Sequence, residues 1–218
     1  MFAYPKQSEF NRVVPKTKIY AHAKVSKRIK ELFARQVGEI LWKYKLSPET
    51  INLPARNGIN EIQVFDVTLK TPELDPDVLQ AIDKAIPFPL LCQLTYDGQV
   101  SFAASYKRPN EADASKWVIE AAFQTAPRPV GAERSPLPVA LDLAGLYEHI
   151  VRCHIPFPQR PGESLAEHIA RFNQLEAKKK VQQKLKARLA QEKQFNRKVE
   201  MNAALRRLSQ ELEALSHE

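Results

Sequence analysis

Residues 90–106, LLCQLTYDGQVSFAASY, carry the clearest structural signal in the chain. Two runs rich in apolar and β-branched residues flank Asp97-Gly98, a pair that readily takes the positive φ angles of a two-residue type I′ turn. We therefore predict a β-hairpin, with one strand on each side of this turn.

Further strands are predicted on both sides of the hairpin. Residues 61–70, EIQVFDVTLK, and residues 117–123, WVIEAAF, are rich in β-branched and aromatic side chains. A short helix over 75–86 precedes the hairpin, because Asp75 can accept a hydrogen bond from a free amide and Pro76 suits a first turn. The expected fold class is α+β, with helices packed on a mostly antiparallel sheet.

The N-terminal residues predict an arm followed by one long helix. Residues 1–20 lack a clear period and contain two prolines, so we expect an extended arm that packs on the domain. From His22 to Tyr44 apolar residues recur at helical spacing, which predicts a helix with one buried face. Ser47-Pro48 should end it, since the residue before proline disfavours helical angles.

The domain boundary is predicted from two proline-rich segments. Residues 125–138 form the first, and a helix over 141–155 follows it. The second segment, residues 155–162, separates that helix from the rest of the chain. We therefore predict an α+β domain over 1–161 and a basic helical tail over 162–218.

The tail lacks Gly and Pro from residue 164 to residue 217, and Ser164 with Glu167 matches a capping box, so it should be helical. Leucines near its end alternate four- and three-residue spacings, which is typical of a coiled-coil seam. A different register upstream predicts a break near residues 190–200, where the tail could fold back as a hairpin. The seam, a candidate homodimer interface, is Met201, Leu205, Leu208, Leu212 and Leu215.

The net charge of +8 is concentrated in two regions, Lys6 to Lys30 and Lys178 to Lys198. Basic residues along a helix can neutralise successive phosphates, so the second region predicts nucleic-acid contact that is directed at the backbone and indifferent to sequence. The alternative interpretation is that this region is the solvent-exposed flank of a coiled coil and does not contact nucleic acid. The predicted contacts are Lys178, Lys179, Lys180, Lys184, Lys186, Arg188, Lys193, Arg197 and Lys198.

Patterns typical of enzymes are weak in this sequence. Asp66 lies in a predicted strand, but Thr68 stands where a restriction-type nuclease would have lysine. Cys153 and His154 are adjacent on a predicted helix, where side chains point about 100° apart. Neither a metal-ligand spacing nor a Gly-rich phosphate loop occurs, so we expect no cofactor and no metal. A metal-dependent nuclease centred on Asp66 and Glu61 stays open as an alternative.

The cellular compartment is predicted from what the sequence lacks. No apolar run reaches the roughly 18–20 residues of a membrane span, and the N-terminal residues contain no apolar signal core. Cys92 and Cys153 are isolated, which argues against a disulfide framework. We expect a cytoplasmic protein.

Five strings together are similar to a known bacterial family. They are PKTKIYAHAKVSKRIKELF (15–33), WKYKLSPETINL (42–53), DKAIPFPLL (83–91), LPVALDLAGLYEHIV (137–151) and EKQFNRKVEMNAALR (192–206). The chain resembles domain of unknown function 4391, whose members are encoded beside helicases and DNA methyltransferases in restriction-like, phage-defence neighbourhoods. The resemblance implies a non-enzymatic accessory subunit with such a protein as its partner, and it brings no catalytic residues.

Overall fold

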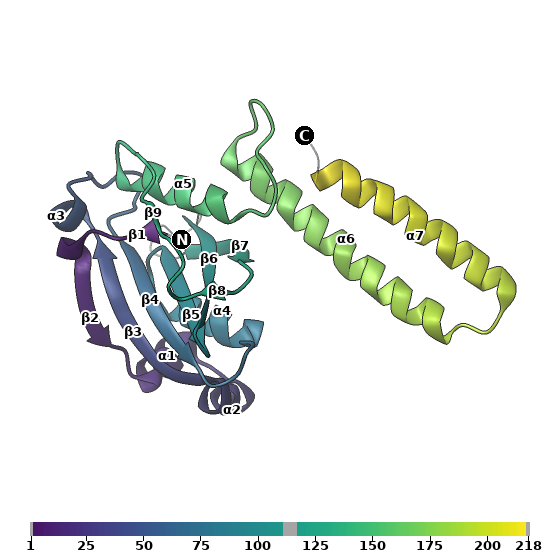
Figure 1. The fold of residues 1–218 in the computed structure, drawn as a ribbon, viewed down its shortest axis with the longest axis horizontal. Helices are drawn as coiled ribbons and strands as arrows, with labels where there is room; N and C mark the ends of the chain where they lie inside the picture. The colour runs from purple at the N-terminus through teal and green to yellow at the C-terminus, as the bar shows by residue number, and fades with distance from the viewer. Residues whose placement is uncertain (1, 111–116, 217–218) are drawn as a thin grey trace. The chain divides into compact units, whose positions relative to one another are not determined.

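The computed structural model describes residues 2–110 and 117–216 (Figure 1). The chain divides into two compact units, Met1–His154 and Ile155–Glu218, which we name the sheet unit and the helical unit. Within the described residues, no helix is both long enough and apolar enough to cross a membrane.

The sheet unit is built on a mixed sheet whose neighbouring strands follow chain order from β2 to β7. All neighbours are antiparallel except β4 and β5, which are parallel and are joined through helix α4 (Pro76–Ala85). The six strands are β2 (Glu9–Val13), β3 (Val37–Leu46), β4 (Ile62–Leu69), β5 (Leu90–Tyr96), β6 (Gln99–Pro109) and β7 (Trp117–Gln124). The α+β class and the mostly antiparallel sheet are confirmed.

Short elements complete this unit. Residues 125–138, predicted as a loop, hold two-residue strands: β8 (Arg128–Pro129) pairs with β6, and β9 (Ser135–Pro136) pairs with β1 (Phe2–Ala3). The remaining short elements are the single turn η1 (Lys6–Ser8) and helix α3 (Pro48–Ile51).

The elements that were predicted from short sequence signals, such as the turn and the helix cap, form where the sequence predicts them. Asp97 and Gly98 have φ angles of 45° and 71°, the two positive values of the predicted hairpin turn between β5 and β6. The amide of Asp77 donates to the Asp75 carboxylate at 2.9 Å, which caps α4. Strands β4 and β7 and helix α5 (Leu143–His154) confirm the other predictions.

The single helix predicted from His22 to Tyr44 is wrong. Helix α1 (Lys16–Ala23) ends at Lys24, which has a left-handed φ of 49°, and helix α2 (Lys27–Gln36) leads directly into β3. Register shifts on both sides of Ile40 and Leu41 interrupt the two-residue alternation of β3. Bulges of this kind leave apolar residues three or four apart, so the apolar residues of β3 have the spacing that is typical of a helix.

The predicted extended arm over residues 1–20 is also wrong in part. Residues 9–13 pair with β3 as the edge strand β2, and α1 begins at Lys16. Asn11, with a φ of 49°, lies at the register shift in β2. Tertiary pairing at the sheet edge therefore orders a segment that has no periodicity of its own.

The two faces of the sheet are covered by different helices. Phe33, Phe65 and Ile82 belong to the core that α1, α2 and α4 make with one face. On the other face Tyr147 of α5 lies parallel to Tyr106 of β6, with ring centres 6.0 Å apart. The Tyr147 hydroxyl donates to the Ser105 carbonyl and accepts from the amide of Lys107 at 2.8 Å.

The helical unit is an antiparallel pair of helices, α6 (Leu165–Gln191) and α7 (Phe195–Ser216) (Figure 1). The predicted capping box is present, since the amide of Ser164 donates to Glu167 at 2.8 Å and the amide of Glu167 donates to Ser164 at 3.3 Å. The helices are separated at residues 192–194, where Glu192 accepts from the two following amides. Of the two predicted forms of the tail, the structure takes the hairpin.

Candidate nucleic-acid interface

The predicted seam lies where the two helices of the helical unit meet. Its five residues are half-buried on α7, which packs along α6, and Leu185 and Leu189 are half-buried on α6. Beside the seam the Lys178 ammonium lies 2.5 Å from the Glu211 carboxylate, and the Gln182 amide donates to Ser209 at 3.0 Å. The seam therefore has a packing role within one chain, and its self-association stays a prediction.

Arg171 holds the open end of the hairpin together. Its guanidinium binds the Glu163 carboxylate through two nitrogens, each at 2.7 Å, and donates at 2.8 Å to the carbonyls of Pro158 and Leu215. It also lies 4.4 Å from the centre of the Phe157 ring. The hydrogen bonds from Arg171 lower the pKa of Glu163 to about 2.

Three of the nine predicted nucleic-acid contacts form ion pairs inside the helical unit. Lys178 binds Glu211, Lys179 binds Glu176 at 2.9 Å, and Arg197 lies 3.9 Å from Glu192. The other six are exposed, and within residues 2–110 and 117–216 none of them has an ion-pair partner. These six are Lys180, Lys184, Lys186, Arg188, Lys193 and Lys198.

Lys180, Lys184 and Arg188 form a row on α6, which we name the basic stripe. Residues four apart lie one above the other on a helix, about 6 Å apart along its axis. At about 100° per residue, the row is centred about 120° around the helix axis from the half-buried side chains of Leu185 and Leu189, and all three of its side chains are exposed. The basic stripe is therefore open to a ligand along the outside of the hairpin.

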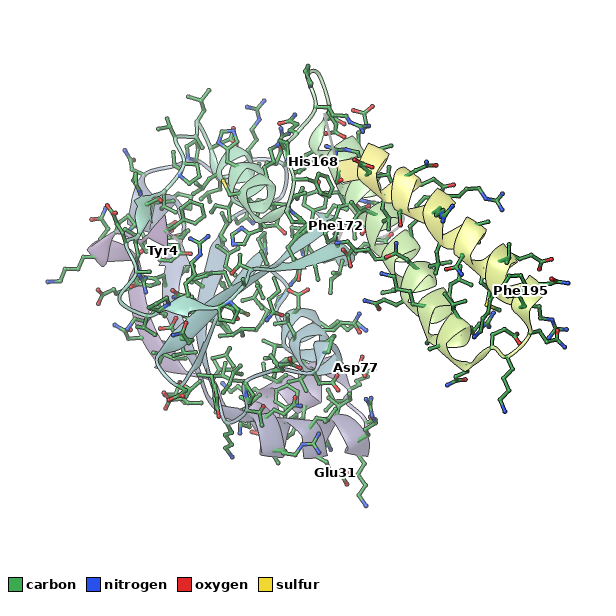
Figure 2. All side chains as sticks on the ribbon, turned by 45° about the vertical axis from the view of Figure 1, so that its right-hand side comes forward. Tyr4, Glu31, Asp77, His168, Phe172 and Phe195 are labelled. Carbon is green, nitrogen blue, oxygen red and sulfur yellow. The ribbon has the colours of Figure 1, made fainter. Side chains whose placement is uncertain are left out.

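The turn end of the hairpin combines basic and apolar side chains. Phe195, labelled in Figure 2, begins α7 and is 77% exposed. Val199, on the second turn of the same helix, is 52% exposed. Lys193 and Lys198 are exposed close by in the sequence. An aromatic ring beside ammonium groups is a surface on which an unpaired base could stack.

A second candidate site, which the sequence did not predict, is a cavity of about 680 Å³ in the sheet unit. It is bounded by β2, β3 and β4, by α1, and by the end of α4 with residues 86–88. Its lining is mainly apolar and aromatic, and four basic residues also belong to the lining. The aromatic residues are Phe10, Trp42, Phe65 and Phe88, and the basic residues are Arg12, Lys18, His22 and Lys84.

Two buried polar residues also line this cavity. Glu61 is 9% exposed and Gln63 is 4% exposed. The Gln63 amide donates to the Glu61 carboxylate, and the Lys45 ammonium lies 3.2 Å from the same carboxylate. The negative charge of Glu61 is thus balanced by Lys45, so the side chains of Arg12, Lys18 and Lys84 give the cavity a net positive charge.

Lys107 fixes the cavity wall formed by residues 86–88. Its ammonium lies 2.9 Å from the Asp83 carboxylate and donates to the carbonyls of Asp83, Ile86 and Phe88 at 2.7–2.9 Å. Burial lowers the pKa of Lys107 and raises the pKa of Asp83, and the attraction between the two charges opposes both shifts. Lys107 therefore binds the carbonyls at the C-terminal end of α4 and orients the chain that carries Phe88.

The two acids of the nuclease alternative lie on opposite faces of the sheet, Glu61 directly before β4 and Asp66 within it. Glu61 and Phe65 line the cavity, whereas Asp66 follows Phe65 in the strand and so points to the other face. There Asp66 accepts a hydrogen bond from Gln93, and burial raises the pKa of Asp66. In the described part of the chain, no three or more His, Cys, Asp or Glu residues are grouped to hold a metal.

Cys153 and His154 lie in the last turn of α5. The Nδ1 atom of His154 faces the Ile150 carbonyl at 2.7 Å, within its own helix. Cys153 is exposed, while the other cysteine, Cys92, is buried, and burial raises the pKa of the Cys92 thiol.

The fold and these surfaces define a class: an α+β sheet domain that carries a basic helical hairpin. The chain belongs to the family described as Domain of unknown function (DUF4391), which matches residues 2–212. The resemblance predicted from the five strings is thereby confirmed. No match was found to a curated protein or to a solved structure.

Proposed function

We propose that this chain is a non-enzymatic accessory subunit of a bacterial DNA-processing or phage-defence assembly, and that its helical hairpin contacts nucleic-acid phosphates. The observation that supports this proposal is the basic stripe. Lys180, Lys184 and Arg188 are exposed on one helix face without an ion-pair partner in the described part of the chain.

A helix face that contacts only solvent would have a different charge pattern from the basic stripe. On such a flank acidic and basic residues alternate at spacings of three or four, so that they pair along the helix, as Lys179 does with Glu176. From residue 177 to residue 191 the sequence contains no Asp or Glu. A run of like charges costs free energy by mutual repulsion, and a polyanion relieves that cost.

The contact should be indifferent to sequence. Lysine ammonium groups bind phosphates as point charges, and base edges are read by side chains that enter a groove in a fixed orientation. In this arrangement the hairpin anchors the assembly on the nucleic acid, while a helicase or DNA methyltransferase partner supplies the chemistry. Co-purification of tagged full-length protein with the products of its neighbouring genes tests the partnership, and recovery of neither enzyme class would contradict it.

The test of nucleic-acid contact compares two triple variants of the full-length chain on duplexes of unrelated sequence. Lys180→Ala, Lys184→Ala and Arg188→Ala together should weaken binding to every duplex equally. The control removes three exposed charges from the sheet unit, through Lys6→Ala, Lys27→Ala and Arg35→Ala. Equal losses in both triple variants would show that net charge matters and that the stripe does not.

A further inference from the structure

We propose that the cavity of the sheet unit binds a nucleotide, either free or at the end of a nucleic-acid strand. The base would lie against the aromatic wall, and the phosphate would lie among the basic residues around it. This inference goes beyond the proposed function, because it concerns another unit of the chain and a ligand with both a base and a phosphate.

The size of the cavity fits such a ligand. Small-molecule sites usually measure about 300–1,000 Å³ and are apolar, with a few polar groups that fix orientation. At about 680 Å³ the cavity lies within that range. A single nucleotide fits this volume, whereas a duplex, whose grooves alone are about 6–12 Å wide, is far too large.

The aromatic wall supplies a surface for a base. Phe10, Trp42 and Phe88 are half-buried, so part of each ring is accessible from the cavity. The rings of Phe10 and Trp42 are 4.1 Å apart, and the indole nitrogen of Trp42 donates to the Tyr44 carbonyl at 3.0 Å. Trp42 is therefore held in place before a ligand arrives, which reduces the entropic cost of binding.

The surrounding charges select an anion. Arg12, Lys18 and Lys84 are exposed and line the cavity, and no ion-pair partner for them lies in the described ranges. Lys18 also belongs to the first turn of α1, where free amides add a partial positive charge. The Arg12 guanidinium lies 4.4 Å from the centre of the Phe10 ring and the Lys84 ammonium donates to the Gln80 side chain at 3.1 Å, contacts that leave both positive charges without a counter-charge. A phosphate would supply that counter-charge, whereas an uncharged apolar ligand would not.

The buried polar pair fits the edge of a base. Polar side chains that are buried are normally fully hydrogen-bonded, and a carboxylate can accept several bonds. Glu61 accepts from Gln63 and binds Lys45, and its oxygens keep further capacity for an N–H group of a base. These two residues would orient the base within the cavity.

The experiment uses Trp42 as the reporter. The chain has two tryptophans, so Trp117→Phe leaves Trp42 as the single source of indole fluorescence. The full-length Trp117→Phe protein is titrated with nucleoside monophosphates, with a 5′-phosphorylated single strand, and with a circular single strand that has no ends. Calorimetry on the unsubstituted chain repeats each titration, in case the Trp117→Phe variant folds poorly.

Saturable quenching by a mononucleotide, or by the linear strand and not the circular one, supports the proposal and identifies the source of the ligand. Lys18→Ala with Lys84→Ala should then weaken binding about tenfold or more, as expected for lost charged hydrogen bonds. Lys27→Ala with Arg35→Ala, two exposed positions of the sheet unit outside the cavity and the basic stripe, should leave the affinity unchanged. Absence of Trp42 quenching by both the mononucleotides and the linear strand, or an unchanged affinity in the Lys18 and Lys84 variant, would overturn it.

Discussion

Lys107 in the sheet unit and Lys184 in the helical unit have the same side chain and opposite surroundings. Lys107 is 2% exposed and contacts one carboxylate and three carbonyls. Lys184 is exposed and has no ion-pair partner among the described residues. The difference teaches that basic residues in this chain divide into those that hold the fold and those that remain free for a ligand.

Removing the buried lysine should give the largest effect. Lys107→Met leaves the Asp83 carboxylate buried without its counter-charge, and breaking one partner of a buried pair typically costs about 3–5 kcal/mol. The free energy of unfolding from urea titration measures this loss. Lys184→Met is the matched control and should stay within about 0.5 kcal/mol of the unsubstituted chain. A Lys107→Met chain as stable as its control would remove the basis of the comparison.

Substitutions in the seam should give the next largest effect. Leu208→Glu with Leu212→Glu places two charges in the half-buried contact between α7 and α6, so the hairpin should open and lose helical circular-dichroism signal. The loss should be the same at every protein concentration, because the contact lies within one chain. Ala203→Glu with Gln210→Glu changes exposed positions of α7 and should have little effect. A loss that depends on concentration would instead assign the seam to a homodimer.

Acid should loosen the open end of the hairpin. Arg171 lowers the pKa of Glu163 from 4.5 to about 2 in the folded chain, so the folded state binds fewer protons than the unfolded state between these values. The stabilisation is therefore present above pH 4.5 and is lost as the pH falls toward 2. Melting temperatures between pH 7 and pH 2 should show this loss, and Glu163→Gln should reduce the pH dependence. An unchanged dependence in that variant would assign the effect to other carboxylates.

How far the sequence predicted the fold depends on the range of the interactions. The Asp97-Gly98 turn, the Asp75 cap and the Ser164 capping box act over four residues or fewer, and all three appear as predicted. Strand β3 was missed because its register and bulges are set by β2 and β4, which lie far from it in the sequence. A local apolar period could not reveal that pairing.

How far the candidate sites could be predicted also depends on the sequence distance between their residues. The basic residues of the hairpin were found because they lie close together in the sequence, although the sequence could not show that Lys178, Lys179 and Arg197 form ion pairs. The cavity joins Phe10, Trp42, Glu61 and Phe88, which come together only when the sheet forms. The one signal available was the cluster of basic residues from Lys6 to Lys30, which includes Arg12 and Lys18.

The central claim is that the exposed lysine and arginine side chains of the basic stripe contact nucleic-acid phosphates. The salt dependence of duplex binding tests this claim most directly. Each phosphate contact contributes about −0.9 to the slope of log K against log salt concentration. The account predicts that the full-length chain binds with a steep slope, and that replacing Lys180, Lys184 and Arg188 by alanine makes it shallower by up to about 2.7, while the sheet-unit control keeps it. An identical slope in all three proteins, or no binding at low salt, would contradict the account.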